Sequence, residues 1–122
     1  MFNMNYHEEE KILYVTFDGI IDIQDMFSGL KYLEEDPRLP DNLKILENAE
    51  KAHVTFNEND IPGLIENLER TIIKFTSVRH AVVHTNPVNT AYAMLGEQLV
   101  RKSKYTLKVF SNTEAAKAWL NV

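Results

Sequence analysis

The feature that most limits the fold of this chain is a repeated exchange between short apolar runs and longer stretches with apolar residues at helical spacing. Strands are expected at residues 2–6, 11–17, 43–46, 78–84 and 106–110, and helices are expected where apolar stripes run over residues 23–33, 61–72, 88–99 and 115–120. Strands joined through a helix tend to lie parallel, because right-handed crossovers favour that arrangement. The order ββαβαβαβα therefore predicts an α/β fold with a five-stranded, mostly parallel sheet, an N-terminal antiparallel hairpin and four helices.

Cap and breaker residues mark the expected ends of these helices. Asp22 is placed to cap the first helix, and Pro37 is expected to stop it. Asn59 or Asp60 is expected to cap the second helix. The third is expected to begin at Asn86, which precedes a proline, and Ser111 with Glu114 has the spacing of a capping box for the last helix. Residues 47–59 are interpreted as a polar connection, and the chain as a single domain over residues 1–122.

Composition excludes several classes of protein. The 13 basic and 18 acidic residues give a net charge of −5, which argues against broad nucleic-acid binding because that binding neutralises phosphates. The absence of cysteine excludes thiolate chemistry and disulfides. No window approaches the length of a transmembrane segment, and the first residues lack the basic and apolar regions of a signal peptide. We therefore expect a cytoplasmic protein.

The residues that usually carry chemistry do not form an active-site pattern. His80 and His84 lie on one face of the same predicted strand, about 13 Å apart, which is too far to share a metal ion alone. They are interpreted as partly buried, hydrogen-bonded residues or as polar groups at the end of the strand. The sequence has no Gly-x-Ser-x-Gly or Ser-x-x-Lys motif, and its four glycines are scattered. We therefore expect no enzyme, no cofactor and no metal site.

Three segments resemble the SpoIIAA-like family of STAS domains. They are the strand and turn at residues 15–22, the strand at residues 79–83, and the pattern Ala116-x-x-Trp119-Leu120 near the end. The family includes bacterial anti-sigma-factor antagonists, so the resemblance implies a STAS-like fold and a regulatory or binding role.

In the antagonists, a phosphorylatable serine lies in an Asp-Ser-x-Gly turn at the start of the second helix. The corresponding turn here runs from Asp60 to Gly63, and Ile61 stands where the serine would be. Isoleucine has no hydroxyl group to accept a phosphoryl group. The resemblance therefore points to a small stand-alone bacterial member without the phosphorylation switch.

The function expected from these observations is non-enzymatic binding, either of a protein partner or of a small ligand. An alternative is a carrier for an apolar or lipid molecule, similar to CRAL-TRIO domains, and a small hydrolase or transferase is disfavoured. Met26, Phe27, Tyr92 and Met94 are compatible with an apolar cavity, although such residues more often form ordinary core. The sequence does not determine the oligomeric state, and a homodimer is compatible with it.

A binding site is expected beyond the carboxyl ends of the parallel strands, where polar loop residues gather. The expected site residues are Asp22, His53, Asp60, Gly63, Asn86 and Asn112.

Overall fold

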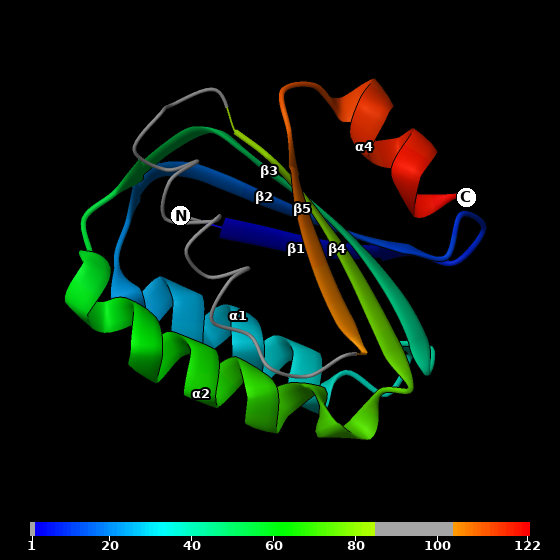
Figure 1. Cartoon of the computed structure of the whole chain (residues 1–122), viewed down its shortest axis with the longest axis horizontal. Coiled ribbons are helices and arrows are strands. Elements are labelled where there is room, and N and C mark those ends of the chain that lie inside the picture. The colour runs from blue at the N-terminus through cyan, green and yellow to red at the C-terminus, as the bar shows by residue number, and fades with distance from the viewer. Residues whose placement is uncertain (1, 85–103) are drawn as a thin grey trace.

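The fold is built on a single five-stranded sheet, seen in a computed structural model that describes residues 2–84 and 104–122 (Figure 1). The strands are β1 (Phe2–His7), β2 (Ile12–Ile21), β3 (Asn42–Val54), β4 (Ser77–Val83) and β5 (Tyr105–Phe110), and they are neighbours in this order. β1 pairs with β2 in antiparallel fashion, and the remaining pairs are parallel. The predicted hairpin and mostly parallel sheet are confirmed.

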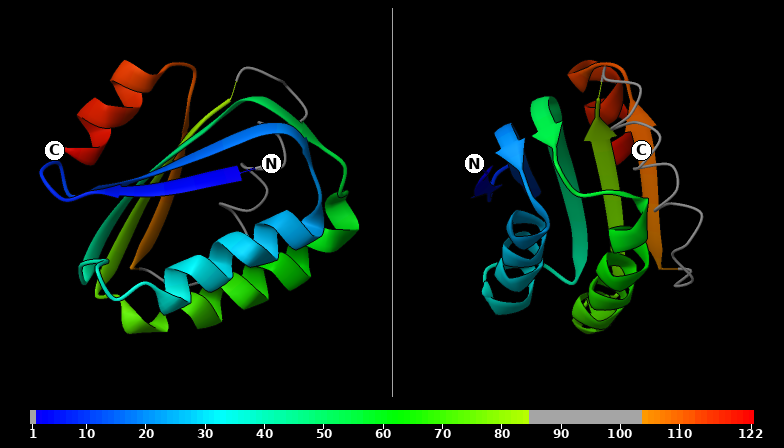
Figure 2. Two further views of the ribbon diagram at one scale, coloured as in Figure 1. Left: turned by 180° about the vertical axis from the view of Figure 1, so that it is seen from behind. Right: turned by 90° about the vertical axis from the view of Figure 1, so that its left-hand side faces the viewer.

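Helices cover both faces of the sheet. α1 (Ile23–Glu35) and α2 (Ile61–Thr71) lie side by side against one face, which we call the inner face, and α4 (Thr113–Leu120) covers the opposite, outer face (Figure 2). Successive right-handed crossovers that advance in the same direction along a sheet place their helices on the same side, which explains the shared face of α1 and α2. Short 3₁₀ helices, Glu58–Asp60 and Ile72–Lys74, flank α2.

Alternation along the strands divides the core into two parts. On β4, Val78 belongs to the inner cluster, whereas Ala81 and Val83 belong to the outer cluster with Leu120 of α4. The inner cluster is the larger one and includes the buried stripe of α2, such as Leu68. This is the packing expected when successive side chains of a strand point to opposite faces.

The third strand differs from its prediction. It spans Asn42–Val54, so most of the stretch interpreted as a polar connection is strand. Between Thr16 and Asp18 of β2, the facing residues of β3 advance from Asn48 to Lys51, so β3 holds one extra residue. Such a bulge shifts the alternation of side chains. Because the alternation is interrupted, the sequence pattern did not predict one continuous strand.

The predicted end of the second strand is also wrong. Asp18 and Gly19 were expected to terminate it, but β2 continues to Ile21. Gly19 has a φ of 74°, a conformation that glycine adopts at little cost. The chain therefore changes direction locally without leaving the sheet.

The cap predictions have mixed outcomes. Asp22 caps α1 in a complete capping box with Asp25, and α1 ends before Pro37, as predicted. The cap of α4 is Asn112 rather than Ser111, since the Asn112 side chain accepts a hydrogen bond from the backbone of Ala115. Asp60 precedes α2 without a side-chain capping bond.

The described residues contain three α-helices rather than the four predicted. The helix expected to begin at Asn86 lies outside the described residues. In the part of the chain that the structure describes, no helix has the length and apolar character needed to cross a membrane.

Candidate functional site

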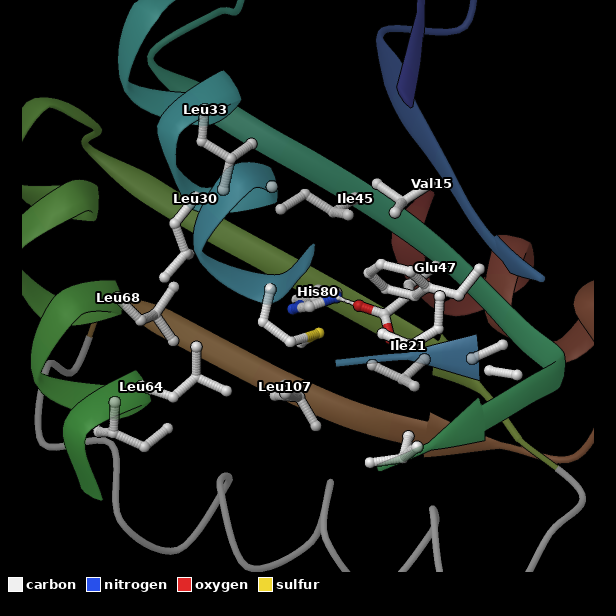
Figure 3. A pocket seen from close by; sticks show the side chains of 18 of the residues that line it. Val15, Ile21, Leu30, Leu33, Ile45, Glu47, Leu64, Leu68, His80 and Leu107 are labelled. Carbon is white, nitrogen blue, oxygen red and sulfur yellow. Dashed lines mark hydrogen bonds and ion pairs between the residues drawn. The ribbon is translucent and has the colours of Figure 1, made fainter. Parts of the chain in front are cut away.

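A cavity of about 160 Å³ lies between the inner face of the sheet and helices α1 and α2 (Figure 3). Its walls are predominantly apolar, with side chains from strands and helices that include Val15, Leu30, Ile45, Leu64, Leu68 and Leu107. Met26 also contributes, so one of the residues considered for an apolar cavity in the sequence does line it.

The strand pattern explains how polar groups enter this apolar space. On β3, Ile45, Glu47 and Ala49 follow one another at a spacing of two and all border the cavity. After the bulge, Ala52 takes the same side. Glu47 is therefore held on the inner face by the alternation of its strand, between apolar neighbours.

A chain of hydrogen bonds crosses the cavity wall through three neighbouring strands. His80 of β4 contacts the Glu47 carboxylate through Nε2 at 2.9 Å, and its Nδ1 contacts the hydroxyl group of Tyr105 of β5 at 2.5 Å. Figure 3 shows Glu47 and His80 facing each other at the centre of the site. Their side chains are only 12% and 15% exposed. Buried polar groups of this kind are stabilised by satisfying one another.

The two hydrogen bonds of His80 determine which ring nitrogen carries the proton when its imidazole is neutral. The Glu47 oxygen accepts, so Nε2 of His80 donates to it, and Nδ1 then accepts from Tyr105. Burial raises the pKa of the Tyr105 hydroxyl group well above its ordinary value, which keeps the hydroxyl group protonated as a donor. Both nitrogens of His80 are occupied, so neither is available to remove a proton from a substrate.

His84 follows β4 and borders the same cavity. Its side chain is buried, and among the described residues its Nδ1 has no hydrogen-bond partner. Burial lowers the pKa of His84, while the nearby Glu47 and a hydrogen bond with the backbone of Ala49 act in the opposite direction. The pKa of His84 is lowered overall, so its imidazole is uncharged at neutral pH.

The described residues around the cavity combine apolar walls with a few buried polar groups. In residues 2–84 and 104–122, no group of three or more histidine and carboxylate side chains is placed to hold a metal ion. Among the described residues, the hydrogen-bond partners of the His80 imidazole are Glu47 and Tyr105, and neither is a serine or threonine. The arrangement suits binding of a mainly apolar molecule that carries a polar group.

The residues expected from the sequence lie elsewhere. Asp22 and Asn112 use their side chains to cap α1 and α4. His53 is exposed near the end of β3 and faces Ile20 of β2. None of these three residues borders the cavity.

The other expected site residues lie around the start of α2 or beyond the described part. The Asp60 carboxylate accepts a hydrogen bond from the backbone of Asn57, and Gly63 is exposed in the first turn of α2. Asn86 lies outside the described residues. The expected site at the carboxyl ends of the strands stays a prediction.

Sequence reasoning missed the cavity residues for identifiable reasons. Glu47 was assigned to a connection, Tyr105 was left outside its strand, and His84 was interpreted only as a hydrogen-bonded residue or a polar group at the end of a strand. One signal was present: Glu47 is in phase with Leu43 and Ile45, so it falls on their buried face. The interpretation of His80 as a buried, hydrogen-bonded residue is confirmed.

Comparison with known proteins addresses the fold. No family model matches the sequence, and no curated protein matches it. An uncharacterised protein of the DUF3478 family from Shewanella loihica PV-4, described as having a SpoIIAA-like fold, matches with a TM-score of 0.63 and 14% identity. That match covers 98% of this chain and 92% of the other.

A second match is the anti-sigma factor antagonist SpoIIAA in its unphosphorylated form. Its TM-score is 0.59 at 12% identity, and the match covers 94% of this chain and 92% of SpoIIAA. This chain has a SpoIIAA-like fold. The fold suggested by the sequence resemblance is confirmed, and at these identities the likeness concerns the fold alone.

The turn that begins α2 of this SpoIIAA-like fold departs from the family motif at Ile61. Its side chain is 3% exposed and borders the cavity, so it belongs to the core. The absence of a phosphorylation switch at this position stays a prediction.

Proposed function

We propose that this chain is a non-enzymatic binding domain that holds a compact, mainly apolar molecule between its sheet and helices α1 and α2. The observation that carries the proposal is the cavity of about 160 Å³, whose described walls are apolar apart from the Glu47, His80, Tyr105 and His84 side chains. An apolar cavity of about 150 Å³ can stay dry and bind benzene. The volume therefore suits a molecule the size of one aromatic ring.

The cavity volume limits the size of the apolar molecule that the domain could carry. A long-chain lipid occupies several times the volume of a single ring, so the cavity supports a small molecule rather than an extended lipid. The walls come from α1, α2 and the central strands, for example Leu30, Leu68 and Ile45. A bound molecule would therefore contact elements that are distant in the sequence. Its binding would raise the free energy of unfolding of the domain.

Two measurements test the proposal. Native mass spectrometry and solvent extraction of the purified chain are expected to show a small co-purified molecule. Toluene titrated into the ligand-free protein is expected to raise the melting temperature, because a ligand at 100 times its dissociation constant stabilises the folded state by about 2.7 kcal/mol.

A pair of variants locates the site. Ala52→Leu places a larger side chain at the cavity wall and is expected to abolish the effect of toluene. Ala118→Leu makes the same change at an exposed position of α4, on the opposite side of the sheet, and is expected to leave the effect intact. Equal toluene effects in both variants, with no co-purified molecule, would contradict the proposal.

A further inference from the structure

The unpartnered nitrogen of His84 indicates what kind of polar group the ligand carries. Nδ1 of this ring is buried, and a buried acceptor without a partner is unfavourable unless something else supplies a donor. His84 borders the cavity, so a molecule in the cavity is within reach of the ring. Among the described residues that line the cavity, Tyr105 and His80 are already hydrogen-bonded in the chain with Glu47, and the remaining walls are mainly apolar.

The hydrogen bonding of the ring identifies this nitrogen as an acceptor. A hydrogen bond with the backbone of Ala49 contributes to the pKa of the imidazole. Since Nδ1 has no partner among the described residues, we infer that Nε2 makes this bond. That bond raises the pKa of His84, as donation from the ring to a backbone carbonyl does. A neutral imidazole that donates through Nε2 has an unprotonated Nδ1, which can only accept.

Charge in the cavity restricts the ligand further. The Glu47 side chain borders the same space, and no lysine or arginine does among the described residues. A carboxylate or phosphate ligand would lie near the Glu47 carboxylate without a balancing cation, and it would have no proton to donate to His84. An ammonium group would lose its hydration among apolar walls, while Oε1 of Glu47 already accepts from His80.

We propose that the ligand is an uncharged molecule of about one aromatic ring that carries a single hydroxyl or ring N–H group, and that this group donates a hydrogen bond to Nδ1 of His84. The inference rests on the proposed function and adds the polar chemistry of the ligand to it. Phenols, small alcohols and indole-like molecules share this chemistry.

Four probes of similar size separate the possibilities: phenol, toluene, benzoate and benzylamine. Titration calorimetry on the full chain near pH 7.5 is expected to show phenol binding about tenfold more tightly than toluene, which corresponds to one hydrogen bond to an otherwise unpartnered acceptor. Benzoate and benzylamine, which are charged at this pH, are expected to bind more weakly than toluene.

Two variants test whether the preference for phenol over toluene depends on the imidazole of His84. His84→Phe keeps an aromatic ring but removes the acceptor, so it is expected to bind phenol and toluene equally. His53→Phe makes the same change at an exposed histidine near the end of β3 and is expected to retain the preference for phenol.

A measurement without substitution covers the case in which His84→Phe does not fold. The ¹⁵N resonance of His84 Nδ1 is expected to shift when phenol is added to the unmodified protein and to stay in place when toluene is added. This readout reports the hydrogen bond directly.

The outcomes separate the two proposals. Binding of toluene and phenol with equal affinity, without a shift of Nδ1, would overturn the inference about His84 and leave the proposed function standing. Tighter binding of benzoate or benzylamine than of phenol would overturn the uncharged ligand class. Failure of all four probes, with no molecule co-purified, would overturn both proposals.

Discussion

The outer face of the sheet carries α4 in a closely packed layer, whereas the inner face carries α1 and α2 around a cavity. On the outer face, Ala81, Val83, Ala116 and Leu120 are completely buried. The polar group at this layer is structural: Arg79 stacks on Trp119 at 4.4 Å and donates to the carbonyl groups of Trp119 and Val122 at 2.6 and 2.9 Å. These contacts hold the end of the chain against the sheet.

The inner face uses its polar groups differently. Glu47, His80 and Tyr105 satisfy one another, but His84 keeps an acceptor without a partner among the described residues. A sheet that needed only stability would place apolar residues at these positions, because burying polar groups is costly. One side of the sheet is therefore closely packed, and the other side retains a cavity and a buried nitrogen without a partner among the described residues, on which the proposed ligand site rests.

The largest expected difference between the faces concerns truncation of a fully packed residue. Leu120→Ala removes a completely buried side chain of α4 and is expected to lower the free energy of unfolding by about 2–5 kcal/mol. Leu64→Ala, at a partly buried position beside the cavity, is expected to cost less. Denaturant unfolding of both variants measures the difference, and a larger loss for Leu64→Ala would break the comparison.

Adding volume tests the same contrast in the opposite direction. Ala81→Val overfills the outer layer and is expected to lower the free energy of unfolding by about 1–3 kcal/mol. Ala52→Val adds the same atoms at the cavity and is expected to leave stability unchanged or to raise it by about 0.5–2 kcal/mol. Thermal unfolding distinguishes them, and equal destabilisation by both would show that the cavity has no room.

The hydrogen-bond chain gives a smaller effect. Tyr105→Phe removes the donor to Nδ1 of His80 and is expected to lower the free energy of unfolding by about 0.5–1.5 kcal/mol. The matched control is Tyr14→Phe, which removes a hydrogen bond to Glu10 at the surface and is expected to cost less. Chemical denaturation compares the two, and a greater loss for Tyr14→Phe would show that the buried chain is not a stabilising network.

The smallest expected effect is a change in pH dependence. Burial lowers the pKa of His84 in the folded state, so below about pH 6.5 the unfolded chain binds a proton that the folded chain does not. The contribution of His84 to stability is therefore expected to fall as pH decreases from 6.5 towards the folded pKa. His84→Phe is expected to lose this dependence, and His53→Phe to retain it.

Unfolding free energies at several values between pH 7.5 and 5.5 measure this dependence. The advantage of the unmodified protein over His84→Phe is expected to shrink as pH falls. An advantage that grows instead would show that protonated His84 is stabilised in the folded state, contrary to the direction of its pKa.

Local patterns were sufficient for much of the fold. The buried stripe of α2 and the cap at Asp22 follow from the period of apolar residues and from one well-placed carboxylate, and both are confirmed. The cap of α4 was misplaced by one residue, because Ser111 and Asn112 both have side chains suited to the position. The length of β3 was missed because a bulge breaks its alternation, and bulges depend on the pairing of two strands.

By itself, the sequence determined the order of the described strands and helices, their apolar faces and the resemblance to a SpoIIAA-like fold, because these depend on spacing within continuous segments. Only the tertiary structure decided that Glu47, His80 and Tyr105 meet, since they lie on three different strands and their contacts depend on register. It also decided that Nδ1 of His84 has no hydrogen-bond partner among the described residues and that a cavity of about 160 Å³ borders this side chain, because both are results of how separate elements pack together.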